Sequence, residues 1–235
     1  MDYPLVRLVG MKSEAVSTDD WGVFGHEQPT ALPSEALRHL DRLADEVDRR
    51  ESGEQLSPLI AEWAGHVAEA MGLDDDARVR CVAGGRFHDV GKAAIPDSIL
   101  CKAGPLTGED TELIRQHPEQ GARLVGGVPE LERVAEIVRA HHERYDGRGY
   151  PDGLAGEAIP VEARIVAVCD AWAGMRGARA FRGPLATRQA VQQLRGGAGS
   201  EFDPAVVDAF LHLLETGVMS DLPDEPVAVQ AAGGL

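Results

Sequence analysis

Histidine and aspartate side chains occur in this sequence where the surrounding pattern calls for apolar residues. The stretch RFHDVGKAAIP, residues 86–96, places His88, Asp89 and Lys92 within five positions at the end of an apolar segment. Further along, Asp170 interrupts the apolar run ARIVAVCDAWAGM. Burying an unpaired carboxylate costs several kcal/mol, and a bound cation is one of the few partners that can offset this cost. These positions predict a metal site.

Further histidines extend this set, namely His117 and the adjacent pair His141 and His142. Neighbouring helical residues diverge by about 100°, so His141 and His142 can both face one centre only near a helix end, or if they serve different partners around it. Imidazole and carboxylate without cysteine suit iron, manganese or zinc. An aspartate flanked by histidines can bridge two ions, and metal pairs roughly 3.5 to 4 Å apart are a recurrent solution for phosphoester hydrolysis.

The elements that position these residues are predicted to be helices almost throughout. Apolar residues recur at helical spacing over 37–87, and alternation with a period of two is scarce. Helix starts are marked by Thr107, by Pro160, and by Asp203 with Pro204. Residues 143–160 are polar and rich in glycine, which predicts a loop, and long loops in compact domains are usually functional. The expected fold class is therefore all-α.

The chain of 235 residues is long enough for one large domain with an appendage. Turn formers and prolines over 1–33 predict an arm or small appendage, followed by the helical domain over 34–219 and a flexible tail over 220–235. No stretch approaches the ~18 apolar residues of a membrane span, and the first residues hold no signal-peptide run. We therefore expect a cytoplasmic protein.

The charge balance argues against two classes of partner. The 23 basic and 39 acidic residues give a net charge of -16, which opposes attraction to nucleic acids and to anionic membranes. The three cysteines include no C-x-x-C pair and are typical of reduced thiols in a cytosolic protein. A small-molecule partner fits best, and a homodimer or a regulatory protein partner stays open.

Four motifs, in order and spacing, resemble the HD-GYP family of the HD phosphohydrolase superfamily. They are HDVGK at 88–92, HPEQG at 117–121, HHERYDGRGYP at 141–151, and Asp170. With the linking segment 99–110, the resemblance runs from about 50 to 216. It implies an all-helical HD-type bundle with a bi- or trinuclear iron or manganese site in its centre. The activity it implies is hydrolysis of cyclic di-GMP to pGpG or GMP.

The resemblance also implies roles for individual residues. Asp89 would be the catalytic carboxylate that bridges two ions, and Lys92 would contact a substrate phosphate during catalysis. One metal site would be completed by three histidines and the second by one histidine and one aspartate. The implied metal ligands are, in chain order, His88, Asp89, His117, His141, His142 and Asp170. The implied substrate-binding residues are Lys92, Arg148, Tyr150, Arg179 and Arg182.

Two departures from the family pattern stand out. An early histidine is expected where this chain has Gln55 or Leu56, and Glu51 or Glu54 is a candidate substitute ligand. Downstream, where the family usually reads Asp, Thr and Tyr, the residues here are Ala173, Arg176 and Phe181.

These departures leave two alternatives to cyclic di-GMP hydrolysis. One is an HD-type phosphohydrolase that acts on another nucleotide or on a phosphorylated metabolite. The other is a catalytically weak regulatory protein that binds the messenger and lacks one metal ligand.

Overall fold

The computed structural model describes residues 34–177 and 183–222. Within these ranges the chain forms α-helices and short 3-10 helices and no β-strand, which confirms the all-α prediction. The helices are α2 (Glu35–Glu51), α3 (Ser57–Ala70), α4 (Asp75–Phe87), η1 (Val90–Ala94), α5 (Asp97–Leu100), α6 (Gly108–Ile114), α7 (His117–Gly126), η2 (Pro129–Leu131), α8 (Val134–Ala140), η3 (Gly156–Ala158), α9 (Val161–Arg176), α10 (Thr187–Gly197) and α11 (Pro204–Glu215). The predicted arm over 1–33 lies outside the described residues.

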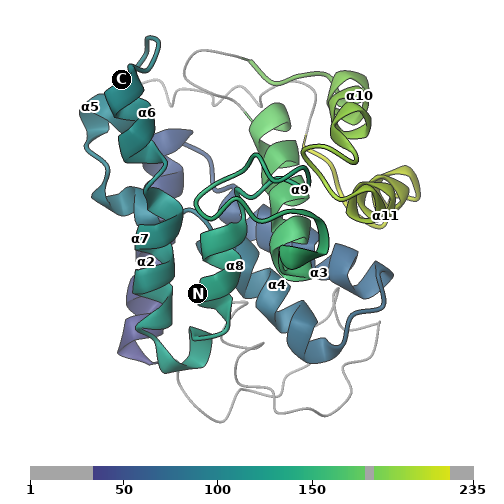
Figure 1. The fold of residues 1–235 in the computed structure, drawn as a ribbon, viewed down its shortest axis with the longest axis horizontal. Coiled ribbons are helices and arrows are strands. Elements are labelled where there is room, and N and C mark those ends of the chain that lie inside the picture. Colours follow the sequence, from purple (N-terminus) through teal and green to yellow (C-terminus); the bar gives the residue numbers. More distant parts are fainter. Residues whose placement is uncertain (1–33, 178–182, 223–235) are drawn as a thin grey trace, which may run out of the picture.

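Helices α3, α4 and α9 contact one another and form the middle of the bundle. Figure 1 shows α7 and α8 on one side of α9, and α10 and α11 on the other. Two clusters of buried apolar side chains result. One joins α3, α9 and α11 around Trp63, Trp172 and Phe210, and the other joins α2, α4, α7 and α8 around Phe87 and Val138.

The predicted helix starts are confirmed, and their caps satisfy backbone groups that a helix end leaves open. Thr107 Oγ1 accepts from the backbone N–H of Asp110, whose carboxylate accepts from Thr107 N in return, so α6 begins with a capping box. Asp203 caps α11 by accepting from Ala205 N. Pro160 directly precedes α9, as expected.

Glycines inside the motifs allow the backbone to approach closely. A Cβ on Gly85 would lie 2.9 Å from the Cα of Ala61, so the glycine lets α4 cross α3 at short range. Gly91 in η1 packs on the start of α7, where its Cβ would lie 2.1 Å from the carbonyl oxygen of His117 and 2.5 Å from the nitrogen of Gly121. The HDVGK and HPEQG motifs therefore meet through their glycines.

Gly91→Ala is expected to destabilise the chain by about 1 to 3 kcal/mol, the usual cost of overpacking. The added methyl group would overlap backbone atoms of α7, which cannot rotate away as a side chain can. Urea unfolding of the metal-free protein measures the effect. The control is Gly196→Ala, because a Cβ at this helical position meets nothing within 4 Å. Equal stability of the two variants would contradict the close approach of η1 to α7.

Residues 220–222, which the sequence pattern assigns to the tail, contact the bundle. The indole N–H of Trp63 donates to the carbonyl oxygen of Ser220 at 3.1 Å, and that of Trp172 donates to Asp221 Oδ1 at 3.0 Å. Residues 223–235 lie outside the described part of the chain. None of the described helices is both long and apolar enough to cross a bilayer.

Candidate metal centre

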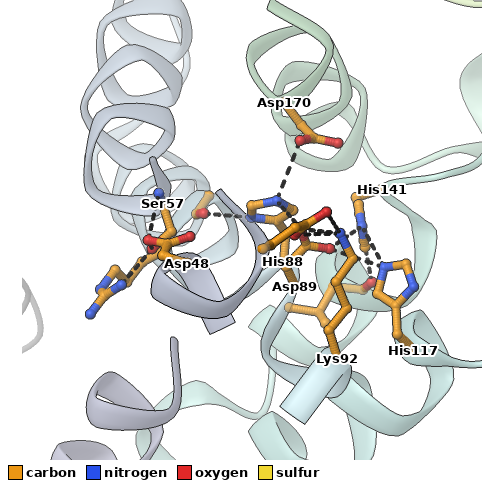
Figure 2. A network of polar contacts seen from close by, with 12 residues as sticks. Asp48, Ser57, His88, Asp89, Lys92, His117, His141 and Asp170 are labelled. Carbon is orange, nitrogen blue, oxygen red and sulfur yellow. Dashed lines mark hydrogen bonds and ion pairs between the residues drawn. The ribbon is translucent and has the colours of Figure 1, made fainter. Parts of the chain in front are cut away.

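Six histidine and aspartate side chains converge from separate elements. His88 follows α4, Asp89 precedes η1, His117 opens α7, and the pair at 141–142 follows the last residue of α8. Asp170 projects from α9 (Figure 2). His88 directly follows Phe87, and Asp170 directly follows Cys169. Because Phe87 and Cys169 are buried in the two apolar clusters, the packing of these clusters fixes where the polar side chains lie.

The first group consists of Asp89 and three histidines, whose ligand atoms all lie within 4.8 Å of one another. His117 Nε2 lies 3.1 Å from Asp89 Oδ1, and His141 Nε2 lies 3.8 Å from the same oxygen. The Nε2 atoms of His117 and His141 are 3.4 Å apart. His142 completes the group.

The second group consists of His88, Asp89 and Asp170. His88 Nε2 lies 3.2 Å from Asp89 Oδ2 and 3.5 Å from Asp170 Oδ1. The two oxygens of Asp89 therefore face different groups, and this carboxylate is the residue that the groups share. A carboxylate in this position could offer one oxygen to each group.

In three of the histidines, a hydrogen bond to the backbone determines that Nδ1 carries a proton. Each Nδ1 lies within 2.8 Å of a backbone carbonyl oxygen, which only accepts, so Nδ1 donates and Nε2 is the nitrogen that lies near Asp89. The pairs are His88 with Gly85, His117 with Ile114, and His141 with Val138.

This arrangement fits a divalent cation. The buried oxygen Asp89 Oδ1 has no well-aligned hydrogen-bond donor among the described residues, and His117 Nε2 lies 3.1 Å from it. Burying a carboxylate oxygen without a hydrogen bond is costly, and a cation held between it and the imidazole nitrogens would offset this cost. Nitrogen and carboxylate oxygen ligands without sulfur suit iron, manganese or zinc.

Burial and charge set the protonation of the centre. Burial lowers the pKa of His141, and the hydrogen bond with Asp89 offsets only part of this effect. Burial, with the neighbouring His141 and His117, also holds the pKa of His142 well below its usual value. Both rings are therefore neutral near pH 7 and offer lone pairs. Burial raises the pKa of Asp170, but the hydrogen bond and charge of His88 outweigh it and hold the pKa below the usual range.

Lys92 lies at the edge of the centre, between two carboxylates. Its ammonium donates to Asp89 Oδ2 at 2.7 Å and to both oxygens of Glu51 at 3.0 Å. Burial lowers the pKa of Lys92, but the charges of Asp89 and Glu51 outweigh it, so the net pKa is raised and the side chain is cationic. Glu51 thus reaches the centre through Lys92.

Among the described residues, neither ligand group includes Gln55 or Leu56, which stand where the early histidine is expected. Leu56 is buried in the apolar core, and Gln55 is exposed. Glu54 does not belong to either ligand group, and nor does Glu51.

A buried polar network fixes the helix that carries Glu51. Asp48 on α2 accepts from both the backbone N–H and the hydroxyl of Ser57 on α3, at 3.0 and 2.7 Å (Figure 2). Burial raises the pKa of Asp48, and the hydrogen bonds from Ser57 offset only part of this effect. Arg86, two residues before His88, donates to Ser57 and to Asp41 of α2. The network ties α2 and α3 to the end of α4.

The glycine-rich loop is held beside the histidines by two contacts that the sequence does not reveal. The buried carboxylate of Glu143 accepts three backbone N–H groups of the loop, from Asp152, Gly153 and Leu154. The ring of Tyr150 stacks on His142, with 5.0 Å between centroids and 26° between planes. Burial, followed by the charge of Asp89, raises the pKa of Tyr150 to about 12.

Arg115 lies beside the site, and sequence reasoning did not single it out. Its guanidinium carbon lies 5.1 Å from the centre of the Tyr150 ring. Arg148, predicted to bind substrate, is exposed on the loop, and its backbone N–H donates to Asp146 Oδ1 at 3.1 Å. The other predicted substrate residues, Arg179 and Arg182, lie outside the described residues, as does Phe181.

Two of the three residues that depart from the family pattern downstream of Asp170 have a structural explanation. Ala173 is buried in the core. Arg176 is buried as well, and its guanidinium donates to Asp221 and to the carbonyl oxygens of Leu185 and Leu222. Arg176 thus anchors the segments on either side of α10 and α11.

Comparison with known proteins places these features in a family. Residues 33–206 match the model of the HD domain. The chain is similar to the cyclic di-GMP phosphodiesterase response regulator RpfG of Xanthomonas campestris pv. campestris, with 42% identity over 176 residues, which are 73% of this chain and 46% of that protein. It is also similar to 3'3'-cGAMP-specific phosphodiesterase 2 of Vibrio cholerae, with 32% identity over 185 residues, which are 77% of this chain and 35% of that protein.

A solved structure shares the fold. The HDG"Y"P protein from Bdellovibrio bacteriovorus matches 77% of this chain and 63% of its own with a TM-score of 0.58 and 16% sequence identity. The chain spans less than half the length of the two relatives above. The HD model nevertheless covers most of the chain and contains all six residues of the centre. The chain therefore belongs to the HD domain family, and within it to the HD-GYP proteins that its motifs resemble.

Proposed function

We propose that this chain is a metal-dependent phosphodiesterase that hydrolyses cyclic di-GMP to pGpG or GMP. The observation that carries the proposal is the shared carboxylate of Asp89, which belongs to two groups of candidate ligands whose nitrogen and oxygen atoms lie close together. The similarity to a cyclic di-GMP phosphodiesterase over 73% of the chain supports the substrate. The ligand types support iron or manganese as the metal.

Each part of the centre has a role in this reaction. Two divalent ions would supply an activated water and stabilise charge at the phosphate. Asp89 would hold both ions, and His88, His117 and Asp170 would help to fix their separation. Lys92 remains a cation because Asp89 and Glu51 raise its pKa, so it can pair with a non-bridging phosphate oxygen as charge develops. Tyr150 would form the rim of the pocket beside His142.

The test is turnover of cyclic di-GMP by the anaerobically purified chain supplied with Fe(II) or Mn(II). Products are separated by chromatography and metal content is measured on the same samples. Release of pGpG or GMP is the expected result. Bound metal without turnover of any phosphoester would overturn the proposal and favour the regulatory alternative, which would bind the messenger without hydrolysing it.

A second cyclic dinucleotide is the main alternative substrate. The chain is 32% identical to a 3'3'-cGAMP-specific phosphodiesterase over 77% of its length. A panel of cyclic di-GMP, 3'3'-cGAMP and nucleotide monoesters at equal concentration separates these substrates by kcat/KM. A preference for monoesters would favour the broader phosphohydrolase alternative.

A further inference from the structure

Arg115 lies over the ring of Tyr150, which stacks on a histidine of the candidate metal centre. It lies between α6 and α7, two residues before His117. Its guanidinium carbon is 5.1 Å from the centre of the Tyr150 ring, and that ring stacks on His142 at 5.0 Å. Tyr150 therefore contacts both Arg115 and His142.

The donors of Arg115 are available to a ligand. Its side chain is 53% exposed, and the carboxylate recorded near it among the described residues is that of Glu112, at 3.9 Å and 73% exposed. An exposed pair at this distance contributes little. A guanidinium presents five N–H donors in a planar fork, and phosphate matches that fork with two parallel hydrogen bonds.

Three other described cations around the site are held by carboxylates at short range, whereas Arg148 on the glycine-rich loop is exposed. The three are Lys92 with Glu51 at 3.0 Å and Asp89 at 2.7 Å, Arg139 with Asp152 at 2.7 Å, and Arg144 with Asp146 at 2.9 Å. The chain as a whole carries a net charge of -16. A substrate with two phosphates therefore needs a local cation beyond Lys92 to offset this repulsion.

We propose that Arg115 binds the second phosphate of a cyclic dinucleotide, the one that is not cleaved. Arg115 contacts Tyr150 rather than the ligands themselves, and its side chain is 53% exposed, so the guanidinium can reach a phosphate that projects from the centre toward solvent. Its role is to select diesters that carry a second phosphate. This inference rests on the proposed function.

The test compares two substrates on the metal-loaded full chain. Cyclic di-GMP has two phosphates, whereas bis(p-nitrophenyl) phosphate has a single diester. Arg115→Ala is expected to raise KM for cyclic di-GMP about tenfold, with kcat changed less than twofold, and to leave both constants for bis(p-nitrophenyl) phosphate unchanged. Arg115→Lys keeps the positive charge and is expected to raise KM for cyclic di-GMP less than Arg115→Ala does.

The matched control is Arg123→Ala on α7, whose side chain is 72% exposed and pairs with Glu119. It is expected to match the unmodified chain on both substrates. Equal losses on both substrates in Arg115→Ala would assign Arg115 to the support of Tyr150 and His142, and no loss would remove it from the site. Either result overturns the proposal.

If the proposed function is wrong, the measurements differ from those that would reject the role of Arg115. If the unmodified chain cleaves bis(p-nitrophenyl) phosphate but not cyclic di-GMP, the same variants are compared by the Kd of cyclic di-GMP in calorimetry. A tenfold weaker Kd in Arg115→Ala alone would support the role of Arg115 and reject only turnover. Absence of binding by the unmodified chain would overturn both.

Discussion

Asp89→Ala is expected to remove most of the bound metal and to abolish phosphodiesterase activity. Asp89 is the residue common to both ligand groups, with one oxygen 3.1 Å from His117 Nε2 and the other 3.2 Å from His88 Nε2. Its loss would remove a ligand from both of the proposed ions and also the charge that would offset their mutual repulsion. Because metal ions supply several kcal/mol of charge stabilisation, turnover should fall by more than about 10³-fold.

The metal content of the purified variant tests this prediction without any assay of activity. Asp76→Ala is the matched control, since it removes an exposed carboxylate from the first turn of α4, the helix that ends at His88. The control should keep its full metal content. Circular dichroism of both variants establishes that the fold is retained. Unchanged metal content in Asp89→Ala would contradict the shared centre.

The candidate residues of this centre could be named from the sequence because their signals are local. His88, Asp89 and His117 stand at helix ends. His141 and His142 can share a centre only near a helix end, and α8 does end at Ala140. The helical class and the cap at Thr107 follow from similarly short-range patterns.

The features that sequence did not reveal depend on distant contacts. Glu51 and Lys92 are far apart in the chain, and only the packing of α2 on η1 brings them together. The position of Arg115 over Tyr150 requires both the start of α7 and the fold of the glycine-rich loop. Arg176 reads as a lost substrate contact in the sequence, but it is a buried anchor for the chain near Asp221.

Asp170→Asn is expected to remove one ion and to leave the other in place. Asp170 belongs only to the group with His88 and Asp89, whereas the group with His117 does not use it. An amide keeps the shape of the side chain but loses the negative charge, so its oxygen is a weaker ligand for a divalent cation. The metal content should fall by half.

Turnover in Asp170→Asn should fall by more than about 10²-fold, because one of the two ions that stabilise the phosphate would be missing. The matched variant is His142→Ala, which removes a ligand only from the four-residue group. If the groups hold separate ions, each variant loses one ion and Asp89→Ala loses both. If Asp170→Asn kept the full metal content while His142→Ala lost all of it, the centre would hold its metal in the four-residue group alone. The group of His88, Asp89 and Asp170 would then be a hydrogen-bonded support for Asp89.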